Sequence, residues 1–296
     1  MRIAFNEVRN NKIKSVLLAV FFIVIIGFLG ALFGVYYGNF YFGLIISIVF
    51  SIIYSLIAYY SGSRMILGMS GARPVTKKEY PHLYHTIEGL AIAAGIPAPK
   101  AYVIDDSAMN AFATGRDPKN ASITVTTGLL KSMNRQELEG VVAHEMSHIK
   151  NFDIRFMMLT AVLVGIITLL SDFMLRSFLW GGKKRERSSG KGAAILILVG
   201  LVLAVLSPII SEMIKLAISR KREYMADANG AILTRYPPGL ANALKKIYKD
   251  PDPLVDQANK ATAHLFISTP FRKGNFSNLF STHPPVEGRI RRLGEM

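Results

Sequence analysis

The chain has 296 residues, which is enough for one large domain or two ordinary ones. Apolar residues make up 51% of it and charged residues only 19%, a balance that argues against an ordinary soluble protein and favours a membrane protein. We assign the net charge of +15 to contact with lipid headgroups, because no motif for binding DNA or RNA is evident, and we expect no nucleic-acid partner. The lack of cysteine excludes disulfide bonds and thiolate metal ligands.

The first long apolar run extends from Ser15 to Ser63 and contains no charged residue. A single membrane span needs about 20 apolar residues, so this run is long enough for two spans joined by a turn at Gly38-Asn39. The apolar core of a cleaved signal peptide is much shorter, at about 7–15 residues. We therefore expect two transmembrane helices within residues 15–63.

Positive charges flank this run on both sides. Residues 1–14 carry four Lys or Arg residues, and further basic residues follow residue 63, whereas the turn between the two spans carries none. The positive-inside rule therefore places both flanks in the cytoplasm. We expect a cytoplasmic N-terminus over residues 1–14 and the first part of a cytoplasmic domain over residues 64–153.

Helix and strand signals alternate in the first half of this domain. Apolar residues recur at helical spacing from Tyr84 to Ala91, and Gly95-Ile-Pro97 is expected to end that helix. Three short strand-like stretches follow, at residues 101–104, 111–114 and 122–126, with a turn at Gly115-Arg-Asp-Pro118 between the last two. This mixture predicts an α+β domain.

A second helix of the domain is expected to begin at Asn134. The stretch Asn134-Arg-Gln-Glu137 has the side-chain oxygen and the glutamate of a capping box. Residues 144–148, which read HEMSH, then lie in the middle of this helix. Positions i and i+4 share one helix face, so His144 and His148 can present two imidazole nitrogens to one metal ion.

Glu145 in this pattern is rotated by about 100° from His144, so it can reach a water molecule beside the metal rather than the metal itself. A zinc ion would polarise a substrate carbonyl, and Glu145 would act as the base. The alternative is a helix with two histidines on its surface, and the HExxH pattern in a suitable helix outweighs it.

Two further apolar runs follow, at residues 156–175 and 192–211. Either could be a buried core helix of a soluble protein, but the second has the full length of a membrane span and the first is close to it. We expect these third and fourth hydrophobic segments to form a hairpin over residues 154–218.

A catalytic zinc site needs a third protein ligand. The best candidate lies in the stretch SRKREYMADANG, residues 219–230. Glu223 can complete the site, and Asp227, one turn later on the same face, can hold a ligand histidine through its other ring nitrogen. The alternative is an amphipathic helix that only carries charged residues on its surface.

His144 and Glu223 must lie on the same side of the membrane if they bind one ion, so the chain between them crosses the membrane an even number of times. Two crossings would place residues 181–192, with five Lys or Arg against one Glu, outside the cell. The positive-inside rule disfavours this placement, but the first helix often dominates the topology. We favour two crossings over a hairpin that enters the membrane without traversing it.

Four stretches together resemble one known family. They are NAFATG at 110–115, HEMSH at 144–148, SRKREYMADA at 219–228 and STHPPVEGRI at 281–290. In this combination, and with four hydrophobic segments in the expected places, the chain resembles the HtpX family of membrane zinc metalloproteases, which is of the HExxH gluzincin type and is related to the CAAX-prenyl endopeptidases. The resemblance covers nearly the whole chain.

The resemblance implies one zinc ion per chain, with His144, His148 and Glu223 as ligands and Glu145 as the catalytic base. It also implies that His283 and Arg289 form a pair that helps to stabilise the oxyanion and to order the site. A strand at the edge of the cleft is implied to bind extended substrate, main chain to main chain. This strand consists of Asn110, Ala111, Phe112, Ala113, Thr114 and Gly115.

We therefore predict a multi-pass α-helical membrane protein with an α+β zincin-like cytoplasmic catalytic domain, whose second part covers residues 219–296. By resemblance, it is a zinc-dependent endopeptidase of the plasma membrane that cleaves misfolded or damaged membrane proteins at the cytoplasmic face. Two alternatives remain open: a narrow-specificity peptidase for lipidated substrates, and a non-catalytic membrane scaffold that binds metal. An intact Glu145 argues against the scaffold, because a pure metal binder needs no base there. The sequence does not predict the oligomeric state.

Overall fold

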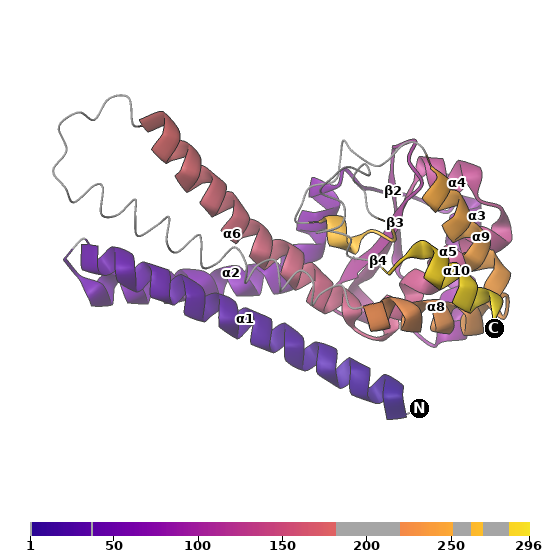
Figure 1. The fold of residues 1–296 in the computed structure, drawn as a ribbon, viewed down its shortest axis with the longest axis horizontal. Helices are drawn as coiled ribbons and strands as arrows, with labels where there is room; N and C mark the ends of the chain where they lie inside the picture. The colour runs from indigo at the N-terminus through magenta and orange to yellow at the C-terminus, as the bar shows by residue number, and fades with distance from the viewer. Residues whose placement is uncertain (1, 37, 182–219, 251–261, 269–283) are drawn as a thin grey trace.

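The computed structural model describes residues 2–36, 38–181, 220–250, 262–268 and 284–296. Long helices extend from one side of a small β-sheet, and shorter helices gather on its other side (Figure 1). The sheet and the shorter helices form the α+β domain expected from the sequence.

The first two helices form an antiparallel hairpin. Helix α1 covers Arg2–Tyr36 and helix α2 covers Phe40–Met69. Between them, Gly38 has a φ of +82°, a left-handed conformation that glycine adopts without steric cost. The side-chain oxygen of Asn39 accepts a hydrogen bond of 3.0 Å from the Phe42 amide and so caps α2. The turn therefore lies at the two residues where the sequence predicts it.

Small residues allow α1 and α2 to approach closely. A Cβ atom added to Gly43 of α2 would overlap the backbone oxygen of Gly30 in α1, and one added to Gly30 would overlap the side chain of Ser47. Packing of this kind joins helices in a bilayer, where burial of apolar surface contributes little because lipid is itself apolar.

Both helices are long and apolar enough to span a membrane, over Asn6–Leu32 and Phe40–Met69. Helix α2 exposes large apolar side chains along its length. They include Tyr41, Phe42, Ile45, Ile46, Val49, Ile53 and Leu56. A continuous apolar surface of this kind is unfavourable in water and fits contact with lipid.

The third predicted hydrophobic segment is also helical, since helix α6 covers Asp153–Gly181. The fourth, at residues 192–211, lies outside the described residues.

The sheet has four strands in the order β1-β2-β4-β3. Their bounds are Arg73–Pro74 for β1, Lys100–Ile104 for β2, Ala111–Gly115 for β3 and Ala121–Thr126 for β4. Strands β2 and β4 are parallel, and β1 and β3 pair antiparallel with β2 and β4. The three predicted strands are confirmed, each with one additional residue, and β3 lies at the edge of the sheet.

Successive side chains of β3 point to opposite faces of the sheet. Ala111 and Ala113 belong to the core formed with α5 (Arg135–Lys150), whereas Phe112 packs on the other face with residues of α6. The edge strand therefore lies between the helical layer of the domain and the first turns of a long helix.

Short helices complete the domain. They are α3 (Pro81–Ala94), α4 (Thr127–Ser132), α8 (Arg220–Thr234), α9 (Pro237–Lys249), α10 (Val286–Gly294) and the 3-10 helices η1 (Pro118–Asn120) and η3 (Ala263–Leu265). Helix α5 is central among them and packs against α3, α8 and α9.

Two predicted helix boundaries are confirmed by their hydrogen bonds. Asn134 and Glu137 form the expected capping box, in which each side chain accepts from the other residue's amide at 2.9 and 2.8 Å. Gly95 ends α3 in a left-handed conformation with φ of +69°.

Candidate metal centre

Helix α5 places His144 and His148 one turn apart, and both side chains are buried. Helix α8 crosses α5 beside them. The crossing is close because Gly230 has no side chain, and a Cβ atom there would lie 3.1 Å from the backbone nitrogen of His144. This approach brings Glu223, which is also buried, to the two histidines.

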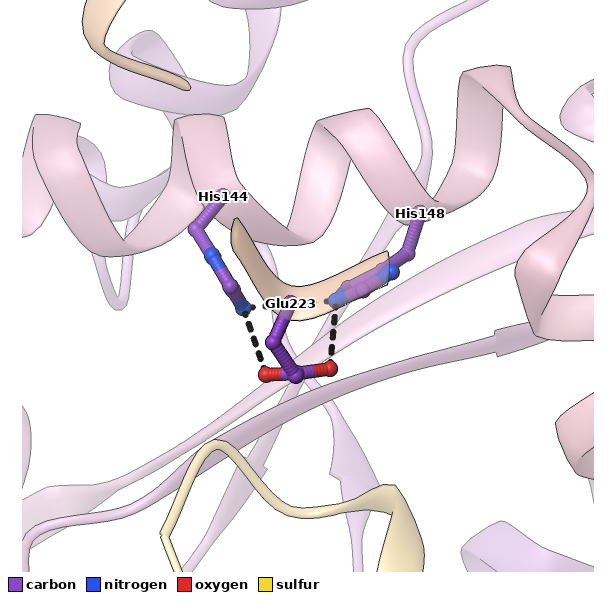
Figure 2. A group of neighbouring side chains, drawn as sticks. All are labelled: His144, His148 and Glu223. Carbon is purple, nitrogen blue, oxygen red and sulfur yellow. Dashed lines mark hydrogen bonds and ion pairs between the residues drawn. The ribbon is translucent and has the colours of Figure 1, made fainter. Parts of the chain in front are cut away.

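The three side chains offer their donor atoms to one point. The Nε2 atoms of His144 and His148 are 3.3 Å apart, and each faces a different carboxylate oxygen of Glu223, at 3.7 and 3.6 Å (Figure 2). Zinc–ligand bonds of about 2.0–2.1 Å in a tetrahedron imply distances of about 3.4 Å between ligand atoms. Three donors at 3.3 to 3.7 Å therefore fit one tetrahedral zinc ion, with the fourth position left over.

Each histidine is also held by a carboxylate on its other ring nitrogen. The Nδ1 of His144 lies 3.0 Å from Asp227, and the Nδ1 of His148 lies 3.0 Å from Asp153. A neutral ring that donates from Nδ1 keeps the lone pair on Nε2. The two lone pairs then face each other, an arrangement that is repulsive without a cation and suits two ligands of one metal ion.

Positive charge is favoured at this point of the structure. Burial would lower the pKa of His148, but its hydrogen bond to Asp153 and the nearby carboxylate of Glu223 outweigh this effect and raise the pKa to about 9. Burial lowers the pKa of His144. The carboxylates around the two histidines therefore favour positive charge at this point, which suits a divalent ion.

Glu145 lies next to the cluster without belonging to it. Its carboxylate accepts a hydrogen bond from the backbone amide of Ala113 in β3. Burial raises the pKa of Glu145 to about 7, and the negative charge of Glu223 acts in the same direction. A carboxyl group with such a pKa can accept and release a proton near neutral pH.

Arg289, on α10, is fully buried beside the histidines. Its Nε and one terminal nitrogen donate to the two oxygens of Asp227 at 2.8 and 2.6 Å, and its other terminal nitrogen lies 3.7 Å from Glu223. Despite burial, this pairing lowers the pKa of Asp227 to about 2. Arg289 therefore neutralises a carboxylate that holds His144.

The structure brings together most of the residues that the sequence singles out. His144, Glu145, His148, Glu223, Asp227 and Arg289 share one buried cluster, and the strand Asn110–Gly115 lies beside it through the bond from Ala113 to Glu145. His283 lies outside the described residues.

The sequence analysis missed Asp153. This buried residue begins α6, and its carboxylate meets both His148 and the Nε of Arg222 at 3.0 Å. An acidic residue a few positions after a ligand histidine is a weak signal, because its contact depends on the turn between them.

Comparison with known proteins identifies relatives over most of the chain. The family described as "Peptidase family M48" matches residues 77–296. A "Protease HtpX homolog" of Dictyoglomus thermophilum is 54% identical over 239 residues, 81% of this chain and 77% of the relative. The protein of the same name from Ligilactobacillus salivarius is 39% identical over 295 residues, 99% of each chain.

The fold also resembles a solved structure. The crystal structure of S. mikatae Ste24p matches 98% of this chain and 67% of that chain, with a TM-score of 0.51 and 21% sequence identity. At this level of identity, the similarity concerns the fold alone.

Proposed function

This chain belongs to peptidase family M48 and is a membrane-bound, zinc-dependent metalloprotease, and from that premise we propose that His144, His148 and Glu223 bind the catalytic zinc ion. The donor distances of 3.3 to 3.7 Å among these three side chains carry the proposal. When bound, zinc acts as a Lewis acid that polarises the scissile carbonyl and lowers the pKa of water.

Glu145 is the general base in this proposal. Its ionised carboxylate accepts the proton of the attacking water and passes it to the leaving amine. Its bond to the amide of Ala113 holds the carboxylate between the histidines of α5 and the edge strand β3.

The neighbouring charged residues keep the ligands in place. Asp227 and Asp153 fix the Nδ1 atoms of the two histidines, so that both Nε2 atoms remain available for the metal. Arg289 contacts Asp227 and Glu223, which supports the site-ordering part of the role implied by resemblance. Stabilisation of the oxyanion is assigned to His283 on the sequence resemblance.

The outer edge of β3 is the proposed substrate-binding surface. The amide of Thr126 in β4 donates to the carbonyl of Asn110, so the backbone groups of alternate residues, including Ala113, point away from β4. On this outer edge the carbonyl of Ala111 accepts the amide of Ile267 at 2.9 Å. Among the described residues, the carbonyl of Ala113 has no hydrogen-bond partner there, and it lies beside Glu145. An extended substrate added here pairs through its main chain, which favours broad sequence selectivity.

We place the site at the cytoplasmic face of the plasma membrane. Helix α6 begins five residues after His148, so the metal cluster lies close to a long apolar helix. The chain then has four membrane-crossing segments, and its catalytic domain is built from residues 64–153 and 219–296. A site in this position suits cleavage of misfolded or damaged membrane proteins at their cytoplasmic loops and ends.

The Glu145→Gln variant tests the mechanism. Gln keeps the size of the side chain but cannot accept a proton, so cleavage of a membrane protein with an unfolded cytoplasmic loop should fall by about 100- to 10,000-fold, whereas zinc content stays at one ion per chain. Glu139→Gln is the matched control, because Glu139 lies on the same helix and only pairs with Arg135 at the surface. Cleavage by Glu145→Gln at the rate of this control would disprove the proposed role.

A further inference from the structure

The N-terminal part of α1 reaches the metal cluster through one buried residue. Asn11 is completely buried although it lies in a stretch flanked by charged residues. Its side-chain amide donates to the carboxylate of Asp153 at 2.6 Å and to the backbone oxygen of Asn151 at 2.9 Å. These contacts join residues about 140 positions apart at the point where α5 ends and α6 begins.

Asp153 is the residue through which this contact reaches the metal ligands. One of its oxygens faces the Nδ1 of His148 at 3.0 Å, and the other receives the amide of Asn11. Arg222, in the turn of α8 that carries Glu223, also donates to Asp153, and its terminal nitrogen donates to the side-chain oxygen of Asn11 at 3.3 Å. Asn11 therefore contacts both the carboxylate of Asp153 and the guanidinium of Arg222 that pairs with it.

The turn that carries Asp153 is strained. Phe152 has a φ of 60°, a left-handed conformation that is costly for a bulky residue. Neighbouring side chains hold this turn, since Lys12 of α1 lies over the Phe152 ring at 4.4 Å. A strained turn keeps its geometry only where its surroundings fix it, and α1 supplies two of those contacts.

We propose that Asn11 is a positioning residue of the metal centre, which fixes the carboxylate of Asp153 against His148 and so couples the first membrane helix to zinc binding. This inference rests on the proposed zinc ligands. Its consequence is that displacement of α1 weakens metal binding without any change in the ligands themselves. Groups that orient a ligand histidine in this way commonly change metal affinity by about 10- to 100-fold.

The test measures zinc affinity rather than proteolysis. Full-length protein in detergent carries Glu145→Gln, which prevents self-cleavage, and its zinc dissociation constant is measured by competition with a chelator. In Asn11→Asp the shape is kept, but an oxygen replaces the amide that faces Asp153, and Asn11→Ala removes the side chain. We expect both variants to bind zinc about tenfold more weakly than the parent.

Two controls lie on the same helix. Ser15→Ala removes a hydroxyl that donates only to the backbone of Asn11, and Glu7→Gln removes the surface pair with Lys221. Both controls should bind zinc within about twofold of the parent, since neither side chain contacts Asp153. A general loosening of α1 would instead affect them as much as the Asn11 variants, and that result would overturn the inference.

A double-mutant cycle separates positioning from stability. If Asn11 acts through Asp153, then Asn11→Ala has no further effect on zinc affinity in an Asp153→Ala background. An equal, additive loss in both backgrounds would overturn the inference. His144→Ala, measured alongside, separates the role of Asn11 from the proposed zinc ligands. If His144→Ala loses zinc but the Asn11 variants bind it normally, only the role of Asn11 is overturned. If His144→Ala still binds zinc fully, both proposals are overturned.

Discussion

At the residue scale, the negative charge of Asp227 in the cluster is balanced mainly by a single partner. Arg289 neutralises it with two hydrogen bonds, and both residues are buried. We predict that Arg289→Met, which leaves Asp227 buried without its partner, reduces the free energy of unfolding by about 3–5 kcal/mol. Chemical denaturation of the purified protein in detergent measures this change.

A second substitution separates stability from metal binding. Asp227→Asn in the Arg289→Met background removes the unpaired charge, so part of the lost stability should return. Zinc affinity should remain about tenfold or more below that of the wild type, because a neutral amide holds the Nδ1 of His144 less well than a carboxylate. Equal stability of the single and double variants would contradict the assigned pairing.

The acid side of the pH profile of cleavage should follow the ionisation of Glu145. Burial raises its pKa to about 7, and only the ionised form can accept a proton. The value of kcat/KM should therefore fall about tenfold per pH unit on the acid side of the profile. The positive charge of bound zinc lowers the pKa of Glu145, so the midpoint should lie at or below pH 7. Zinc content is measured at each pH, because protonated histidines release metal. A midpoint well above pH 7 at full zinc content would contradict the assignment of Glu145 as the base.

At the element scale, the crossing of α5 and α8 sets the distance between the ligands. A Cβ atom on Gly230 would lie 3.1 Å from the His144 nitrogen and 3.3 Å from its Cα, so α8 must move by a few tenths of an ångström in Gly230→Ala. Glu223 moves with its helix. We predict a severalfold weaker zinc affinity and a loss of about 1 kcal/mol in the free energy of unfolding.

Gly89 provides the matched control for this prediction. It lies on the exposed face of α3, and no atom lies within 4 Å of an added Cβ. Gly89→Ala should leave zinc affinity unchanged and stabilise the protein by about 0.5–1 kcal/mol, because alanine loses less backbone freedom on folding. Weaker zinc binding in this variant as well would show that the effect of Gly230→Ala is not local.

The elements themselves were predictable where their signals are local. The capping box at Asn134 and Glu137 and the left-handed Gly95 depend on contacts within a few residues, so the sequence contains them. Strand β1 has two residues and exists only through its pairing with β2, which no local pattern shows.

Asp153 illustrates the same limit inside the site. In a continuous helix it would lie about 140° around the axis from His148, too far to touch it. The left-handed Phe152 interrupts the helix and turns Asp153 back toward the histidine. The contact between Asn11 and Asp153 is still harder to predict from the sequence, because it joins two residues 142 positions apart.

At the scale of the whole molecule, the metal cluster ties together four segments that are distant in the chain. The histidines come from α5, Glu223 from α8, Arg289 from α10, and Asn11 reaches Asp153 from α1. The clustered residues, with the N-terminal end of α1, must therefore lie on one side of the membrane. The turn between α1 and α2 lies at the far end of the helical hairpin from this cluster (Figure 1).

This arrangement predicts the topology, and the absence of cysteine makes it measurable. Single cysteines are introduced at Lys131 and Arg291, which are exposed in the catalytic domain, and at Asn39 in the turn. A membrane-impermeant maleimide should label the first two only in inverted vesicles and Asn39→Cys only in right-side-out vesicles, because the positive-inside rule places the domain in the cytoplasm. Loss of the cap in Asn39→Cys costs about 1 kcal/mol.

A fourth cysteine distinguishes the two arrangements of the later hydrophobic segments. Two full crossings place Ser188 outside the cell, so Ser188→Cys should be labelled together with Asn39→Cys, whereas a hairpin that does not traverse the membrane would leave it with the catalytic domain. The number of crossings can change without moving the metal ligands, provided that it is even. Labelling of Lys131→Cys and Arg291→Cys on opposite sides of the membrane would contradict the metal cluster as well as the topology. Arg291 lies two residues from Arg289, which pairs with Asp227, so a single buried cluster would then be impossible.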